Sequence, residues 1–192
     1  MAKIGLRKPY YAKYTANNGS VTYSDGAILA KAVDAQIELE DTDAIVLYAD
    51  DAAAESVASF STGNLTLTVD ELSVAKAGAI LGMTPVAVTD PVAGSVLEFK
   101  SGQAIPYLGL GFIVTKVVSN VNKYVGYILP KIQFKIPAGD FTTQGETIEF
   151  QTQELQATIM KDDTANGVWK IEGEFSSIAD AEAWIKNKLS IT

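Results

Sequence analysis

The stretch AILAKAVDAQIELE, residues 27–40, alternates in polarity over almost its whole length. Its apolar side carries Leu29, Val33, Ala35, Ile37 and Leu39, and its other side carries Ala30, Ala32, Asp34, Gln36, Glu38 and Glu40. Only Lys31 interrupts the apolar side. A period of two is typical of a half-buried strand, and a strand of this length would extend over roughly 46 Å. We therefore predict one unusually long strand with an acidic outer face.

The rest of the chain contains signals for further strands and for two helices. Strands are predicted at residues 9–15, 21–23, 64–69, 96–100, 107–119, 123–136, 147–161 and 168–175, and residues 84–94 are predicted to be irregular. Thr68 and Glu71 have the spacing of a capping box, which predicts a helix over 70–81. Ser177 and Asp180 predict a second helix over 178–189, within a C-terminal helical segment, 176–192. No repeat or linker divides the chain, so we predict one mostly β domain over residues 1–192.

The composition excludes several classes of function. The 15 basic and 23 acidic residues give a formal charge of -8, which disfavours a protein that grips nucleic-acid phosphates. Without cysteine or histidine, the chain cannot form disulfides, thiolate zinc sites or histidine-based catalytic sites. No apolar run approaches the roughly 18 residues of a membrane span. We expect a protein made and kept in the cytoplasm, without membrane contact, until it is assembled.

Two glycine-containing motifs resemble ligand-binding loops but lack a required residue. Gly109 and Gly111 are not followed by a third glycine, because Val114 occupies that position, and a β-branched run follows instead of a helix. Residues 162–167, DDTANG, begin like a calcium loop, but Gly173 stands where a bidentate glutamate is needed. We therefore predict turns here, and no cofactor, metal or catalytic residue.

The stretch LYADDAAAES, residues 47–56, groups two aspartates and a glutamate around three alanines. Asp50 and Asp51 would point apart on an extended chain, so a metal or acid-base site would need ligands from elsewhere. A solvated acidic loop is the plain alternative. In a third interpretation, small alanines let the loop lie against a neighbouring subunit while the carboxylates meet basic residues there.

The whole chain resembles the major tail protein, or tail tube protein, family of long-tailed phages that infect Gram-positive bacteria. The resemblance rests on AKIGLRKPYYAKYT (2–15), VTYSDGAILAKAVDAQIELE (21–40), LYADDAAAES, NLTLTVDEL (64–72) and TIEFQTQELQATIM (147–160). Each segment is unspecific alone, and the order, spacing and coverage carry the resemblance.

The resemblance implies an antiparallel β-sandwich or partial barrel with a flanking helix, built into hexameric rings that stack into a hollow tube. Double-stranded DNA would pass through the lumen without specific binding. The implied partners are further copies of the chain and the tail terminator, distal tail and tape measure proteins. The implied location is the virion tail, assembled in the host cytoplasm.

Three sets of residues are the candidate contact sites. Asp34, Gln36, Glu38 and Glu40 are candidates to face the lumen. Leu47, Tyr48, Asp50, Asp51 and Glu55 lie in a predicted long loop, 41–63, that would dock on a neighbouring subunit. Lys3, Arg7 and Lys8 lie in a predicted N-terminal arm, 1–10, that would reach an adjacent acidic surface.

Two alternatives to a phage tail tube stay open at this point. The tube could belong to a tail-like bacteriocin or an injection particle, which the sequence does not separate from a phage. A different class is a carbohydrate-binding β-sandwich module, which would use Tyr10, Tyr11, Tyr14 and Tyr107 as exposed aromatic platforms.

Overall fold

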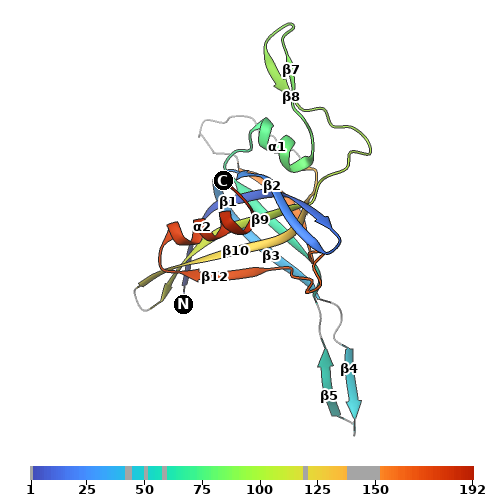
Figure 1. Ribbon diagram of the computed structural model, residues 1–192, viewed down its shortest axis with the longest axis vertical. Coiled ribbons are helices and arrows are strands. Elements are labelled where there is room, and N and C mark those ends of the chain that lie inside the picture. Colours follow the sequence, from blue (N-terminus) through green and yellow to red (C-terminus); the bar gives the residue numbers. More distant parts are fainter. Residues whose placement is uncertain (1, 42–44, 50–51, 58–59, 119–120, 138–151) are drawn as a thin grey trace, which may run out of the picture.

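The computed structural model describes residues 2–41, 45–49, 52–57, 60–118, 121–137 and 152–192. It is mostly β, with antiparallel strands and two helices (Figure 1). The elements in chain order are β1 (Ala2–Asn17), β2 (Ser20–Ile28), β3 (Ala32–Asp41), β4 (Ile45–Ala49), β5 (Ala52–Val57), β6 (Phe60–Val69), α1 (Val74–Leu81), β7 (Val86–Val88), β8 (Gly94–Val96), β9 (Leu108–Val118), β10 (Val121–Phe134), β11 (Gln153–Met160), β12 (Ile171–Phe175) and α2 (Ile178–Lys188).

Eight of the strands form one curled sheet, in the order β2-β1-β9-β10-β11-β6-β3, with β12 paired to β10. The strand β10 is shared, because its first half pairs with β12 and its second half pairs with β11. The sheet bends until its edge strand β3 comes close to β1. The result is the predicted sandwich-like, partly closed architecture.

The main core fills the inside of this curl. Leu65, Leu67 and Val69 point inward from β6 and are fully buried, and the same alternation continues in β11. The helix α1 adds Ile80 and Leu81 to this core. It ends at Gly82, whose left-handed φ of 69° forms the C-cap.

A second, smaller core lies on the outer side of the sheet, under α2. Ala181, Ile185 and Leu189 are fully buried there, and Ser177 caps the helix by accepting a hydrogen bond from the Asp180 backbone N–H. The prediction of this helix is confirmed, with its start at 178 and its end one residue earlier than expected.

Gly109 and Gly111 of the YLGLGF motif lie directly beneath α2. A Cβ at Gly111 would lie 2.6 Å from the Ile185 Cγ2 atom, and a Cβ at Gly109 would lie 2.8 Å from the Leu189 Cδ2 atom. On β10, a Cβ at Gly126 would lie 2.9 Å from the Trp184 ring. These distances are shorter than van der Waals contact, so the glycines let the helix approach the sheet closely.

The prediction of one long strand over 27–40 is wrong. The chain leaves β2 at Ile28 and enters β3 at Ala32, and these strands lie at opposite edges of the sheet. Between them Leu29 is buried, and its N–H donates to the Pro9 carbonyl at 2.8 Å. The Asp70 N–H then donates to the Lys31 carbonyl, and the Lys31 N–H donates to the Asp70 carboxylate. One alternating pattern thus covers two strands that do not pair with each other.

Two other predicted boundaries need correction. The helix α1 begins at Val74 and not at 70, because Asp70 still exchanges hydrogen bonds with Lys31 beyond the end of β6 and Ser73 stands at the N-cap position. The predicted loop 41–63 instead contains a paired hairpin, β4–β5, and the start of β6 at Phe60. Contacts with segments distant in the sequence override the local signals in both places.

Candidate functional site

One outer face of the sheet is polar and acidic. It consists of the outward side chains of β3, β6 and β11, which we call the polar face: Asp34, Gln36, Glu38, Glu40, Thr62, Asn64, Thr66, Thr68, Glu154, Gln156 and Thr158. The register places them in cross-strand rows, for example Gln36 beside Thr66 and Thr66 beside Gln156. All four predicted lumen-facing residues therefore lie together on this face, and all four are exposed.

Hydrogen bonds order the polar face internally. Glu40 accepts from the Thr62 hydroxyl at 2.9 Å and from the Asn64 amide at 2.8 Å. Gln36 donates to Glu38 at 2.9 Å on the same strand. No lysine or arginine occurs within β3, β6 or β11, so the negative charge of this face is not neutralised from its own strands.

The two faces of the sandwich differ in what covers them. The helix α2 packs on the side formed by β1, β9 and β10, whereas neither helix packs on the polar face in the described part of the chain (Figure 1). As far as the described residues go, the polar face is therefore open to solvent or to another large molecule.

Two hairpins project from opposite ends of the long axis (Figure 1). The hairpin β4–β5 extends beyond the end of β3, and it contains Leu47 and Tyr48 in β4 and Glu55 in β5. Asp50 and Asp51 lie outside the described residues. The backbone pairing of this hairpin shows that LYADDAAAES belongs mainly to two strands, not to an irregular loop.

The hairpin β7–β8 extends from the other end, beyond α1, and the sequence prediction missed it. Val86 pairs with Val96, so their side chains share one face with Val88, and all three are exposed. Val92 in the connecting turn is 73% exposed. The sequence signal was the alternating run Val86–Val88, which two nearby prolines made resemble a loop.

The prediction of a basic N-terminal arm that extends to an adjacent subunit does not fit residues 2–10, which pair within their own sheet. They form the first part of β1, in which Lys3 pairs with Lys116 of β9 and Arg7 pairs with Ile113. Two register shifts interrupt this pairing, next to Gly5 and Lys8, which both have positive φ. Sequence reasoning missed this strand because the bulges break its alternation.

Lys8 belongs to a charged cluster between β1 and α2. Its ammonium lies 2.5 Å from the Glu182 carboxylate, which also accepts a hydrogen bond from the Tyr10 hydroxyl. Lys186 adds a second cation at 3.4 Å. The hydrogen bond from Lys8, followed by that from Tyr10, lowers the pKa of Glu182 from 4.5 to about 2. This cluster ties the N-terminal strand to the C-terminal helix.

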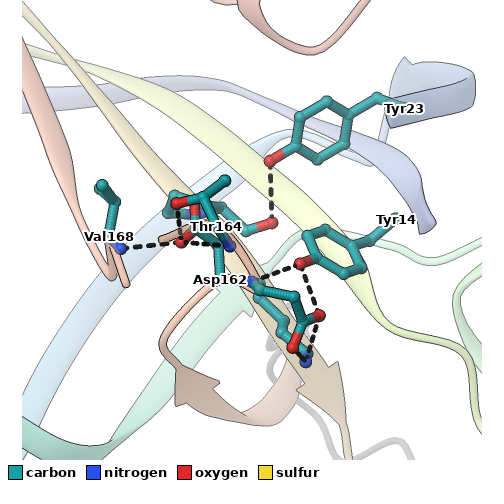
Figure 2. A network of polar contacts seen from close by, with 8 residues as sticks. Tyr14, Tyr23, Asp162, Thr164 and Val168 are labelled. Atoms are coloured by element: carbon teal, nitrogen blue, oxygen red, sulfur yellow. Dashed lines mark hydrogen bonds and ion pairs between the residues drawn. The ribbon is translucent and has the colours of Figure 1, made fainter. Parts of the chain in front are cut away.

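A second polar network joins β1 to the turn between β11 and β12 (Figure 2). The Tyr14 hydroxyl donates to Asp163 at 2.7 Å, and Lys131 binds the same carboxylate at 2.8 Å. Asp162 accepts hydrogen bonds from Thr164 and from the Val168 N–H. The Asp162 carboxylate thus closes a compact turn, because it accepts hydrogen bonds from donors of the same turn.

The tyrosines proposed for sugar stacking are mostly inaccessible. Tyr10, Tyr11 and Tyr14 are buried, and burial together with the Asp163 hydrogen bond raises the pKa of Tyr14 to about 12. Tyr107 is exposed, but the Lys131 ammonium lies 4.6 Å from its ring centroid. This arrangement does not provide the aromatic platform that the carbohydrate-binding alternative requires.

No family model matches the chain, and no curated protein matches it significantly. Within the described ranges, no three histidine, cysteine, aspartate or glutamate residues are grouped so that they could hold a metal ion. Neither of the two described helices is long and apolar enough to cross a membrane. Among the described residues, the exposed polar face and the two projecting hairpins are the candidate functional surfaces.

Proposed function

We propose that this protein is the tail tube subunit of a long-tailed phage or of a related tail-like particle. In this proposal, subunits form hexameric rings, the rings stack into a hollow tube, and DNA leaves the virion through the lumen. The tail terminator, distal tail and tape measure proteins are the expected partners at the tube ends and in the lumen. The protein acts as a structural component and not as an enzyme.

The observation that carries the proposal is the uncovered polar face. Duplex DNA bears one negative charge per roughly 1.7 Å, so a lumen wall that must let it slide should not attract phosphates. Asp34, Glu38, Glu40 and Glu154 give the face four carboxylates, and its strands contain no cation. The ordered threonine, asparagine and glutamine side chains keep it hydrated between those charges.

The edges and ends of the domain supply the contacts that a tube needs. The strands β2 and β3 are the two edges of the sheet, and β3 pairs only with β6 among the described strands. Free edges invite pairing with another chain, and ring closure would satisfy them without open-ended aggregation. The hairpins β4–β5 and β7–β8 extend along opposite directions, as expected for axial contacts to the ring on either side.

Negative-stain imaging and size-exclusion chromatography of the purified chain at neutral pH test the proposal. Rings or tubes of uniform diameter are the expected result. A chain that stays monomeric over a wide concentration range would contradict it.

A charge-reversal variant tests the role of the polar face. Asp34→Lys with Glu38→Lys should allow tubes to form but slow DNA ejection from particles that contain them, because the cations would bind passing phosphates. Glu71→Lys with Glu174→Lys is the matched control, since both residues are exposed and lie off the polar face. Normal ejection by the first variant, or an equal defect in the control, would refute the assignment of this face to the lumen.

A further inference from the structure

The dipeptide asparagine–glycine occurs twice in the chain, at Asn18–Gly19 and at Asn166–Gly167. Asparagine is a chemically labile residue. It is most labile before glycine, because a residue without a Cβ leaves its backbone nitrogen open to approach by the asparagine side chain. Both asparagines are exposed, so neither the local sequence nor exposure distinguishes the two sites. The difference between them lies in the turns that contain them.

Asn18 and Gly19 form the tip of the hairpin between β1 and β2. Asn17 pairs with Ser20, so the turn consists of these two residues alone. Their φ angles are 47° and 77°, as in the type I′ turns that asparagine–glycine favours. The Gly19 N–H forms no backbone hydrogen bond with another described residue, and Gly19 is exposed. Its nitrogen is therefore free to react.

Asn166 and Gly167 lie in the turn between β11 and β12, which is held from both sides. The Gly167 N–H donates to the Thr164 carbonyl at 3.0 Å. The Asp162 carboxylate accepts hydrogen bonds from the Thr164 N–H, the Thr164 hydroxyl and the Val168 N–H (Figure 2). The Gly167 nitrogen is thus engaged, and a reaction at this nitrogen requires the turn to open first.

We propose that Asn18 is a self-modification site, at which the folded protein loses the side-chain amide with time, and that Asn166 is protected. Hydroxide removes the proton of the Gly19 nitrogen, which then attacks the Asn18 Cγ atom. The N–Cγ bond forms and the Cγ–Nδ2 bond breaks, and Nδ2 takes a proton from water and leaves as ammonia. Water then opens the cyclic imide. Addition at Cγ gives aspartate, and addition at the Asn18 main-chain carbonyl carbon gives isoaspartate.

Both products change the tip of the hairpin. Each adds one negative charge to a chain whose formal charge is already -8. The charge is added beside another acidic segment, since a Cβ on Gly19 would lie 3.9 Å from the Asp163 carbonyl oxygen. Isoaspartate also lengthens the backbone by one atom, and a two-residue turn sets the register of its strands. The modification therefore weakens the Asn17–Ser20 end of the hairpin. The inference goes beyond the proposed function and does not depend on it.

Peptide mapping of the aged protein tests the inference. The folded chain is incubated at mildly alkaline pH, and a second sample is incubated in guanidinium chloride, which unfolds it. Trypsin then releases residues 14–31 and 162–170, because lysines precede and end both segments. Each asparagine–glycine site thus lies in its own peptide. Mass spectrometry detects the gain of one mass unit, and fragmentation separates Asn18 from its neighbour Asn17.

We expect Asn18 to be modified at least about tenfold faster than Asn166 in the folded chain, because a hydrogen bond and turn closure protect the second site. In guanidinium chloride the two rates should become similar. Asp162→Ala removes the carboxylate that closes the second turn, so it should raise the rate at Asn166 toward that at Asn18. If this variant does not fold, the folded and unfolded samples of the native chain decide the question alone.

Two results would overturn the inference. One is equal rates at the two sites in the folded chain, or a faster rate at Asn166. The other is an Asn18 that stays intact in the folded chain but is modified in guanidinium chloride. Asn18→Gln is the assignment control, and it should remove the mass gain from the peptide 14–31 without changing the rate at Asn166. A mass gain that persists in this variant would place the modification elsewhere and would also contradict the inference.

Discussion

Gly111→Ala is expected to destabilise the fold because α2 rests directly on this glycine. The new methyl group would lie 2.6 Å from the Ile185 Cγ2 atom and 3.3 Å from the Leu189 Cδ1 atom. Ordinary carbon contacts are about 3.5–4.0 Å, so the helix or the strand must shift by roughly 1 Å. Ile185 is fully buried, and a β-branched side chain in a helix has one strongly preferred rotamer. The clash therefore cannot be relieved by a side-chain rotation alone.

Overpacking of a well-packed core costs about 1–3 kcal/mol, and we expect the free energy of unfolding to fall by this amount. For a chain of this size, each kcal/mol corresponds to a decrease in Tm of about 2–4 °C. Urea denaturation and thermal unfolding, followed by circular dichroism on fractions of equal oligomeric state, measure both quantities. Ile185→Ala alone should also destabilise, and the double variant should lose less than the sum of the two.

Gly94→Ala is the matched control for this prediction. Gly94 lies in the exposed strand β8, its φ is not in the left-handed region, and the nearest atom to an added Cβ is 3.5 Å away. This substitution should change the unfolding free energy by less than about 0.5 kcal/mol. Equal effects of the two substitutions, or no effect of Gly111→Ala, would refute the view that the missing side chain at Gly111 lets α2 pack closely on the sheet.

Three further predictions concern other buried or charged groups. The Thr115 hydroxyl is buried without a hydrogen-bond partner among the described residues. Thr115→Val should therefore leave the free energy of unfolding, measured by urea denaturation, unchanged or raise it by about 1 kcal/mol. A clear loss of stability would show that the hydroxyl has a partner. Because hydrogen bonds from Lys8 and Tyr10 lower the pKa of Glu182 from 4.5 to about 2, its stabilising contribution should be complete above pH 4.5 and lost as the pH falls toward 2. Glu182→Gln should remove this pH dependence, and parallel stability profiles for the two proteins would exclude the cluster as its source. Deletion of residues 1–8 should lower Tm and not only prevent assembly, since it removes strand pairs with β9; a truncated chain of unchanged Tm would contradict this.

The candidate surfaces were only partly accessible to sequence reasoning. The alternation of Asp34, Gln36, Glu38 and Glu40 placed these residues on one face, and the structure confirms that grouping. Their neighbours from β6 and β11 could not be identified, because cross-strand partners lie far away in sequence. The N-terminal basic residues were assigned to an arm because the bulges beside Gly5 and Lys8 hide the strand.

The sequence by itself determined the features that depend on near neighbours along the chain. Alternating polarity determined that Asp34, Gln36, Glu38 and Glu40 share one face of β3, and Ser177 with Asp180 determined where α2 begins. The lack of histidine and cysteine removed whole classes of chemistry before any fold was known.

Only the tertiary structure decided the features that depend on distant pairing. It divided residues 27–40 between the two edges of the sheet, and it placed Gly109 and Gly111 directly beneath α2. It also tied Asp70 to Lys31 and so delayed the start of α1 to Val74. The physical reason is that a period of two says which face of a strand is buried but not which strand lies beside it. That choice is made by contacts between segments far apart in the sequence, where backbone hydrogen bonds and close packing outweigh local preference.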